Sequence, residues 1–313
     1  MIKGWFNVLT KTTHAVDDYV GMANVMPAPL LRIIKRLDDE DVDHVGTRLT
    51  VTSGIGCPRR TLIERLLPTT PDPVRLMAAT LGTGWHGLLA SEMKGMDGWT
   101  VEANGGRDEC RVKGQLLGHA MTGRMDARHE HGGQVDEVWD YKFSMSGADQ
   151  FTDGLKTKGE HAAQLNMLRL LMIQQGMRVS PGVKMTAWVI GKTAVPTVAR
   201  TMDELSIGLT PILNSSFTVR EGTDEVAEAF AMVDRLPQLS SGGPPLEDVR
   251  EVIKAMPMRG LDMLRNDKKG TSLCDYCAFK HDCEELAGRT IDHIRLERTG
   301  KVVEIEKVRR VEL

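Results

Sequence analysis

The cysteines constrain the fold of this 313-residue chain more than any other feature. Cys274, Cys277 and Cys283 form a C-x2-C-x5-C pattern near the C-terminal end, and Cys57 lies far upstream. Thiolates spaced this closely usually bind a metal ion or an iron–sulphur cluster, and a distant fourth ligand would tie two remote segments together. The spacing alone leaves zinc and iron–sulphur open, and His281 could replace one cysteine at a zinc site.

Composition and charge are those of an ordinary globular protein. No apolar run approaches the roughly 20 residues that a membrane-spanning helix needs, and the first residues lack the apolar core of a secretory signal. We therefore expect a cytoplasmic protein without a membrane partner, in which reduced thiols bind metal rather than form disulfides. The net charge of −3 gives no support for nucleic-acid binding, although basic clusters such as Arg59-Arg60 would suffice for a basic channel.

Hydrophobic periodicity predicts an α/β chain, because segments with helical spacing and segments with strict alternation both occur. The predicted helices cover residues 29–38, 57–67, 74–94, 161–174, 224–236 and 246–256. The predicted strands cover residues 49–52, 99–102, 116–128, 134–143 and 183–190. Ser53 is expected to cap the helix over 57–67, and the tail over 291–313 is expected to form an added hairpin.

The two long predicted strands around Gly133 form a candidate acidic centre. If their turn centres on Gly133, Asp126 lies opposite Asp140, with Cβ atoms roughly 4.5–5.5 Å apart. Two carboxylates this close repel each other unless a cation lies between them or one is protonated, so the pair predicts a divalent metal. Lys142 shares the Asp140 side of its strand and could orient or deprotonate a water. The alternatives are an exposed Asp–Lys pair and, for the inward-facing His86, an ordinary core histidine.

Several short motifs follow one another along the chain: Ser53-x3-Cys57-Pro58-Arg59, Gly84-x-His86, Gly123-x2-Asp126, Asp140-Tyr141-Lys142 and Gln164. Their order resembles that of the RecB-like branch of the PD-(D/E)XK nucleases. The closing cysteines resemble those of the iron–sulphur subgroup of that branch. This subgroup includes the nuclease domain of AddB and the CRISPR-associated RecB-like exonucleases, with many phage relatives. The resemblance extends over residues 53–283.

This resemblance implies a restriction-endonuclease-like core, in which helices flank a central mixed β-sheet. The nuclease domain would cover residues 51–290, after an N-terminal extension over 1–50 whose role is not predicted and before the hairpin tail over 291–313. The resemblance also favours a [4Fe–4S] cluster over zinc. Its ligands would be the four cysteines Cys57, Cys274, Cys277 and Cys283, which would close the C-terminal segment onto an N-terminal helix.

The resemblance further assigns roles to the residues of the acidic centre. His86, Asp126, Asp140 and the backbone carbonyl of Tyr141 would bind Mg²⁺ or Mn²⁺. Lys142 would act on the attacking water, and Gln164 would position the lysine or the DNA backbone. The family often has a tyrosine four residues after the glutamine, and this chain has Leu168 there, so a contact from that position is not expected.

The expected activity is that of a Mg/Mn-dependent deoxyribonuclease. It would be an exonuclease that hydrolyses phosphodiester bonds of single-stranded DNA or duplex ends in phage or bacterial recombination, replication or repair. The alternatives are a CRISPR adaptation nuclease that trims spacer precursors and a catalytically silent iron–sulphur DNA-binding scaffold. Related nucleases often assemble as rings, so the resemblance also allows a homo-oligomer. A phage-encoded chain would work in the cytoplasm of its host.

Overall fold

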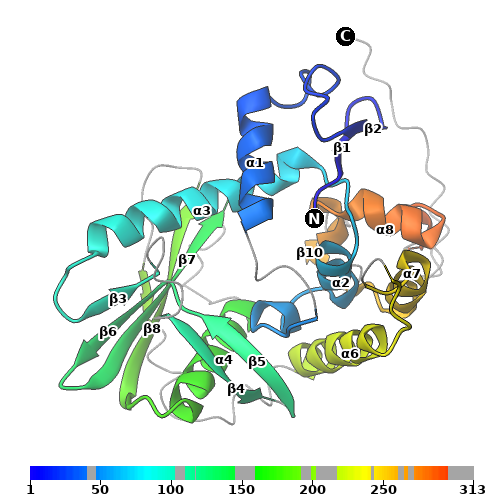
Figure 1. Ribbon diagram of the computed structural model, residues 1–313. Coiled ribbons are helices and arrows are strands. Elements are labelled where there is room, and N and C mark those ends of the chain that lie inside the picture. The colour runs from blue at the N-terminus through cyan, green and yellow to red at the C-terminus, as the bar shows by residue number, and fades with distance from the viewer. Residues whose placement is uncertain are drawn as a thin grey trace.

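The structure is a computed structural model that describes residues 1–40, 47–102, 110–116, 118–144, 159–191, 199–201, 217–240, 243–259, 264–266 and 271–294. Helices and strands are mixed along this length, so the predicted α/β class is confirmed (Figure 1). Among the helices of the described residues, none is long and apolar enough to cross a lipid bilayer.

A mixed β-sheet carries the residues of the predicted acidic centre. In the described part of the chain its strands, in spatial order, are β3 (Trp99–Val101), β6 (Ala127–His131), β7 (Gln134–Ser144), β8 (Val179–Gly191) and β9 (Ala199–Thr201). β7 and β8 run parallel, and the other neighbours run antiparallel. The connection from β7 to β8 contains helix α4 (Gly159–Gln174), because parallel strands need a long crossover.

Helix α3 (Pro73–Met93) covers one face of this sheet (Figure 1). Met93 packs there against Ala127 of β6 and Tyr141 of β7. Val138 of β7 belongs instead to the main core, together with apolar residues of α4. Successive residues of a strand face opposite sides, so β7 presents alternating side chains to α3 and to α4.

The β6–β7 hairpin turns at Gly132-Gly133, where both residues have the positive φ that a tight two-residue hairpin needs. The turn is therefore centred between the two glycines, half a residue away from the predicted centre. A register shift near the turn compensates for this offset, and Ala127 lies opposite Trp139. The ladder ends at this pair and Asp126 lies just outside β6, so its place directly opposite Asp140 stays a prediction.

The single strand predicted over 116–128 is wrong. The chain forms β4 (Arg111–Leu116) and β5 (His119–Arg124), which pair with each other and pack against α4, before β6 begins. Gly118 has a φ of 84° in the turn between them, a conformation open chiefly to glycine. Alternation does not reveal such a turn, because polar and apolar residues keep alternating on both sides of it.

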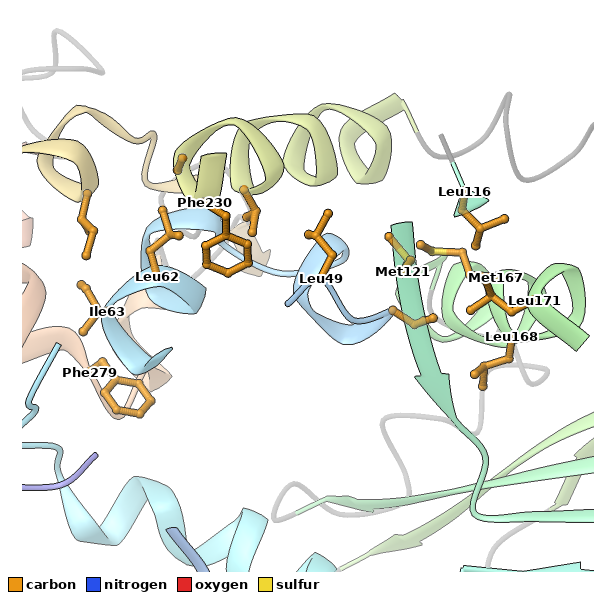
Figure 2. Close-up of a cluster of buried hydrophobic side chains, with 14 of the residues drawn as sticks. Leu49, Leu62, Ile63, Leu116, Met121, Met167, Leu168, Leu171, Phe230 and Phe279 are labelled. Atoms are coloured by element: carbon orange, nitrogen blue, oxygen red, sulfur yellow. The ribbon is translucent and has the colours of Figure 1, made fainter. Parts of the chain in front are cut away.

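A group of helices beside the sheet completes the main core. They are η2 (Thr52–Gly54), α2 (Pro58–Leu66), α6 (Phe217–Asp234), α7 (Leu246–Ala255), η6 (Leu273–Tyr276) and α8 (Lys280–Ala287), with a short hairpin of β10 (Leu264–Asn266) and β11 (Thr271–Ser272). Figure 2 shows Leu62 of α2 near Phe230 of α6 and Ile63 near Phe279, which precedes α8. Leu62 and Ile63 are fully buried, so α2 lies at the centre of this helical layer.

Two local predictions near Cys57 are wrong. Ser53 does not cap α2, because its hydroxyl donates to the Thr50 carbonyl at 2.7 Å, and Cys57 itself is the N-cap residue. The described residues 49–52 make an isolated bridge from Thr50 to Thr122 instead of a regular strand. In both cases Thr50 is involved: its carbonyl binds the Ser53 hydroxyl, and its backbone bridges to Thr122.

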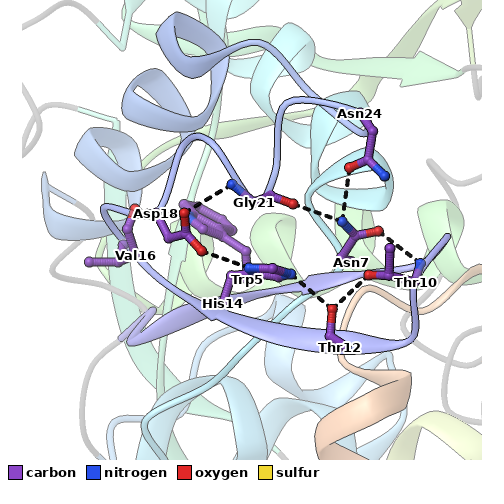
Figure 3. A network of polar contacts seen from close by, with 9 residues as sticks. All are labelled: Trp5, Asn7, Thr10, Thr12, His14, Val16, Asp18, Gly21 and Asn24. Atoms are coloured by element: carbon purple, nitrogen blue, oxygen red, sulfur yellow. Dashed lines mark hydrogen bonds and ion pairs between the residues drawn. The ribbon is translucent and has the colours of Figure 1, made fainter.

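Residues 1–40, where only the helix over 29–38 was predicted, form a small unit with its own apolar centre. Its elements are β1 (Gly4–Asn7), β2 (Thr12–Ala15) and α1 (Ala28–Glu40). Trp5, Met22 and Leu31 are fully buried within it. A polar network around Asn7 and His14 joins β1 and β2 to the loop that leads to α1 (Figure 3).

This N-terminal unit contacts both the beginning of α3 and helix α8. The Lys3 amide donates to the Thr69 carbonyl at 2.9 Å, just before α3, and Leu76 of α3 packs against the apolar centre of the unit. The Phe6 ring stacks on the ring of His281 in α8, with centroids 4.1 Å apart. The N-terminal unit therefore connects the sheet-covering helix with the cysteine-containing segment.

The beginning of the C-terminal tail differs from the predicted hairpin. Residues 291–294 form a helical turn, in which the Ile294 amide donates to the Thr290 carbonyl at 3.2 Å. Residues 295–313 lie outside the described part of the chain.

Candidate functional site

The candidate site lies where β6 separates from β7. Beyond the Ala127–Trp139 pair, β7 continues beside β8, and the Tyr141 backbone no longer has a β6 partner in the ladder. Side chains bind the Tyr141 backbone groups in place of β6. The Asp126 carboxylate accepts a hydrogen bond from the Tyr141 amide at 2.6 Å, and His86 Nε2 lies 3.0 Å from the Tyr141 carbonyl oxygen.

His86 and Asp126 also contact each other. His86 Nδ1 lies 3.2 Å from Asp126 Oδ1, with the two side chains 34% and 13% exposed. Burial lowers the pKa of His86, but the Asp126 hydrogen bond and charge, the Tyr141 carbonyl and the Asp140 charge together raise it above its ordinary value. A protonated imidazole can donate to both oxygens, so this arrangement suits His86 as a cation.

Helix α3 places His86 at the sheet. Ala90 and Met93, four and seven residues after His86, are buried on the face of α3 that packs against the sheet. The His86 ring meets the Tyr141 ring edge to face, with centroids 5.6 Å apart, and the Tyr141 hydroxyl donates to Met93 Sδ at 2.9 Å. The prediction that His86 points inward is therefore confirmed.

Asp140 lies on the other side of β7 from Tyr141, because neighbouring residues of a strand alternate. Its side chain is 4% exposed, and Gln164 of α4 donates to Asp140 Oδ1 at 3.4 Å. The Asp140 charge nevertheless reaches His86, since it contributes to the raised pKa of that imidazole. The structure thus brings together His86, Asp126, Asp140, Gln164 and the Tyr141 backbone.

Lys142 belongs to β7, where its backbone is the partner of Val189 in β8. Its side chain lies outside the described part of the chain. A neighbouring pair was not found by sequence reasoning: the Glu102 amide donates to the Asp126 carbonyl at 3.0 Å, and Arg124 Nε lies 2.9 Å from Glu102 Oε1. This pair brings the end of β3 and the end of β5 together at Asp126. The contact is possible only because the segment predicted as one strand over 116–128 is divided among β4, β5 and β6.

The donors at this fork are an imidazole, two carboxylates and a backbone carbonyl. Oxygen-rich sets of this kind suit Mg²⁺ or Mn²⁺. Among the described residues, no three His, Cys, Asp or Glu side chains are already arranged to hold one ion. His86 and Asp126 use their polar atoms on each other and on Tyr141, so an ion could enter only if the hydrogen bond between His86 and the Tyr141 carbonyl opened.

The cysteines that were predicted to act together come from three segments. Cys57 begins α2, Cys274 lies in η6, and Cys283 lies in α8, which packs against α2. The thiols of Cys277 and Cys283 both interact electrostatically with Cys57. All five cysteines of the chain, Cys110 included, lie in the described part and are free of disulfides.

Burial raises the pKa of two of these thiols. Burial raises the pKa of Cys277, and it raises the pKa of Cys283 to about 11, although the Arg59 charge and hydrogen bond act in the opposite direction. Thiolates are the ligands that a soft metal ion or a cluster prefers, but within the described residues no three of these cysteines are already arranged to hold one. Binding would release the thiol protons.

Arg59 connects α2 with the end of α7. Its side chain is 7% exposed, and it donates to the Met256 carbonyl at 2.9 and 2.6 Å and to the Lys254 carbonyl at 2.6 Å. These carbonyls lie at the helix C-terminus, where a cation also interacts favourably with the helix dipole. The segment around Cys57 is therefore anchored to α7 as well as to α8.

Comparisons with known proteins give little further information. No protein-family model matches the chain, and no curated protein matches it. Among solved structures, one described as "Crystal structure of SSO0001" is similar with a TM-score of 0.40 and 18% sequence identity. The match covers 63% of this chain and 84% of that one. A TM-score of this size is too low to define a shared fold.

Proposed function

We propose that the chain is a metal-dependent DNA exonuclease with a restriction-endonuclease-like core. It hydrolyses phosphodiester bonds of single-stranded DNA or of duplex ends. The observation that carries this proposal is the fork of β7, where His86 and Asp126 bind the two sides of the Tyr141 peptide backbone and Asp140 lies at the adjacent position. Two carboxylates and an imidazole at the end of one strand add nothing to apolar packing, so their presence together favours a chemical role.

The donor set fits a hard divalent cation. His86, Asp126, Asp140 and the Tyr141 carbonyl would hold Mg²⁺ or Mn²⁺, which supplies Lewis-acid activation of water and stabilisation of charge on the phosphate. Asp126 fixes the direction of the His86 ring, and the long hydrogen bond from Gln164 limits the rotation of the Asp140 carboxylate.

Lys142 has a separate role in this proposal. Its ammonium group would orient the attacking water and offset the negative charge that builds on the phosphate during hydrolysis. Its place two residues after Asp140 on β7 supports this role.

The cysteine-containing segments support a second part of the proposal. Cys57, Cys274, Cys277 and Cys283 would bind a [4Fe–4S] cluster that fastens α8 and η6 to the beginning of α2. The cluster would be structural, because these residues belong to the helical layer and not to the fork of β7.

Cleavage of end-labelled oligonucleotides tests the nuclease proposal. Protein purified without oxygen should degrade single-stranded DNA with Mg²⁺ or Mn²⁺ and should be inactive in EDTA. Asp140→Asn and Lys142→Ala should each abolish cleavage and leave the circular dichroism spectrum unchanged. The matched control is Asp136→Asn on the same strand, where the carboxylate is 41% exposed and pairs with His129. Full activity of Asp140→Asn would refute the proposed site.

Iron and sulphide analysis tests the cluster independently. The wild-type protein should contain four irons per cluster, and serine at any of the four proposed ligands should lower the iron content. Cys110→Ser is the matched control, because Cys110 lies outside the proposed ligand set. A protein that contains zinc and no iron would contradict the cluster and leave the nuclease proposal standing.

A further inference from the structure

The N-terminal unit holds a chain of hydrogen-bonded side chains that lies outside the candidate site. Thr12 and His14 are two residues apart in β2, so their side chains lie on the same face of the strand. His14 Nδ1 lies 2.7 Å from Asp18 Oδ2, and His14 Nε2 lies 2.8 Å from Thr12 Oγ1 (Figure 3). A hydroxyl, an imidazole and a carboxylate in this order match a nucleophile, its base and the group that orients the base.

The hydrogen bonds define where the protons of this chain lie. The Gly21 backbone amide and His14 lower the pKa of the Asp18 carboxyl, so Asp18 is ionised at neutral pH. An ionised carboxylate only accepts, so His14 Nδ1 carries a proton and Nε2 of the neutral ring accepts from the Thr12 hydroxyl. Because Thr12 gives its one proton to His14, the Thr10 hydroxyl, 2.6 Å from Thr12 Oγ1, donates to Thr12.

The imidazole of His14 is held in place on several sides. The Asp18 carboxylate, besides its contact with His14, accepts from the Gly21 amide at 2.9 Å. A Cβ atom at position 21 would come too close to His14 Nδ1 and Asp18 Oδ2, so the glycine leaves the room that this pair needs. The fully buried Trp5 is the direct partner of His14 in the β1–β2 ladder and lies on the same face. The base is therefore fixed, whereas the Thr12 hydroxyl is exposed to a reactant.

A purely structural role does not account for this chain of contacts. The buried side chain of Asn7 already joins the hairpin turn to the loop that follows β2. It accepts from the Leu9 and Thr10 amides and donates to the Gly21 carbonyl and to Asn24 Oδ1. The exposed hydroxyl at the end of the chain adds little to this junction, because water would bind it about equally well.

We propose that Thr12 is a nucleophile that His14 activates and that takes an acyl group from an activated ester or thioester. Thr12 Oγ1 attacks the carbonyl carbon, and its proton passes to His14 Nε2. The bond between the carbon and the leaving group then breaks, and the leaving group takes the proton from Nε2. The products are an ester of Thr12 and a free phenol or thiol. Asp18 is a positioning residue, because it orients the ring and stabilises the imidazolium.

The strength of this activation sets the substrate class. General-base assistance contributes about 10²–10⁴-fold, less than the acceleration of about 10⁶-fold or more that complete enzymes reach. The leaving group must therefore depart readily, as a phenol or a thiol does. The acyl-transfer site is separate from the fork of β7, so this inference does not rest on the proposed nuclease.

Reaction of the full-length protein with p-nitrophenyl acetate tests the proposal. The wild type should release a burst of p-nitrophenolate, and mass spectrometry of the quenched protein should find an acetyl group on Thr12. Thr12→Val should lose both signals, whereas Thr12→Ser, which keeps the hydroxyl, should retain them. His14→Gln should slow acetylation by at least about 100-fold. Thr13→Val is the matched control, because Thr13 lies on the opposite face of β2, 3.4 Å from His281, and should change neither signal.

Asp18→Asn separates positioning of the ring from support of the fold. The asparagine oxygen would still accept from the Gly21 amide, so its NH2 group would face His14 Nδ1. The ring must then accept at Nδ1 and carry its proton on Nε2, where it cannot take the proton of Thr12. Acetylation should therefore slow while the stability in urea changes little, and Asp18→Glu should recover part of the rate.

Three results would overturn the proposal. One is a wild-type burst that Thr12→Val leaves unchanged. Another is an acetyl group found only on lysines or on His14, because the hydroxyl would then not be the nucleophile. The third is an acetylation rate of Thr12 that is the same in His14→Gln as in the wild type.

Discussion

Replacing Arg59 should be among the most damaging single changes in the helical layer. Arg59→Met keeps the apolar stem but removes every donor to the Lys254 and Met256 carbonyls. Hydrogen bonds with a charged partner contribute about 1.5–3 kcal/mol each, so two abandoned carbonyls would cost about 3–6 kcal/mol. Lys254 is exposed and lets water reach this helix end, which favours the lower limit. We expect a loss of about 3 kcal/mol in the free energy of unfolding.

Urea denaturation followed by circular dichroism measures this loss. The variant should still fold, because typical domains have about 5–15 kcal/mol of stability. Arg59→Lys should recover part of the loss, since a single ammonium cannot reproduce the forked donation to two carbonyls. Arg60→Ala is the control, because its pair with Glu64 is 3.8 Å long and its side chain is 53% exposed, so it should cost less than about 1 kcal/mol. A loss in Arg59→Met no larger than in Arg60→Ala would refute this reasoning.

Three further predictions concern single groups. Gly87→Ala should raise the free energy of unfolding by about 0.5–1 kcal/mol, because its Cβ meets open space among the described residues; a destabilised variant in urea denaturation would contradict this. In metal-free protein, the stability contributed by His86 should be complete below about pH 6.5 and be lost as the pH rises through its raised pKa. Asp126→Asn should lower that pKa, because burial then dominates, and an NMR titration that finds no decrease would count against the assigned contacts. Asp282→Asn should be at least as stable as the wild type at pH 7, because burial raises the pKa of Asp282 and the asparagine side-chain oxygen still accepts from the Thr70 backbone amide. Near pH 4 the wild-type carboxyl becomes protonated and the advantage of the variant should shrink. Clear destabilisation of the variant in urea at pH 7 would contradict this.

Two of the longer predicted helices are observed nearly to the residue. The helix predicted over 74–94 is observed as α3 (Pro73–Met93), and the helix predicted over 246–256 is observed as α7 (Leu246–Ala255). The apolar spacing of α7 reflects packing on one face through Val249 and Ile253, and the start of α3 follows from Asp72, whose side chain accepts from the Val74 amide. The small N-terminal core was not predictable, because Trp5, Met22 and Leu31 come from a strand, a loop and a helix without a shared period.

The sequence predicts which residues belong to the candidate site, but it does not predict how they contact one another. The order of motifs predicts His86, Asp126 and Asp140 as members of one site, and helical spacing turns His86 toward the sheet. No local rule indicates that Asp126 binds the Tyr141 amide, because that contact exists only where β6 ends and β7 continues. Ser53 failed as a cap for a different reason: its hydroxyl makes a local hydrogen bond to the Thr50 carbonyl three residues earlier, which competes with capping.

Helix α3 extends from the N-terminal unit to the fork of β7. Leu76, near one end, packs against the core around Trp5, and His86 follows ten positions later, about 15 Å along the axis. A tilt of only about 5° around Leu76 would move the imidazole by about 1 Å, which would disturb its contacts with Asp126 and Tyr141. Loosening residues 1–40 would therefore displace His86 from the candidate site at a distance, without touching any other residue of that site.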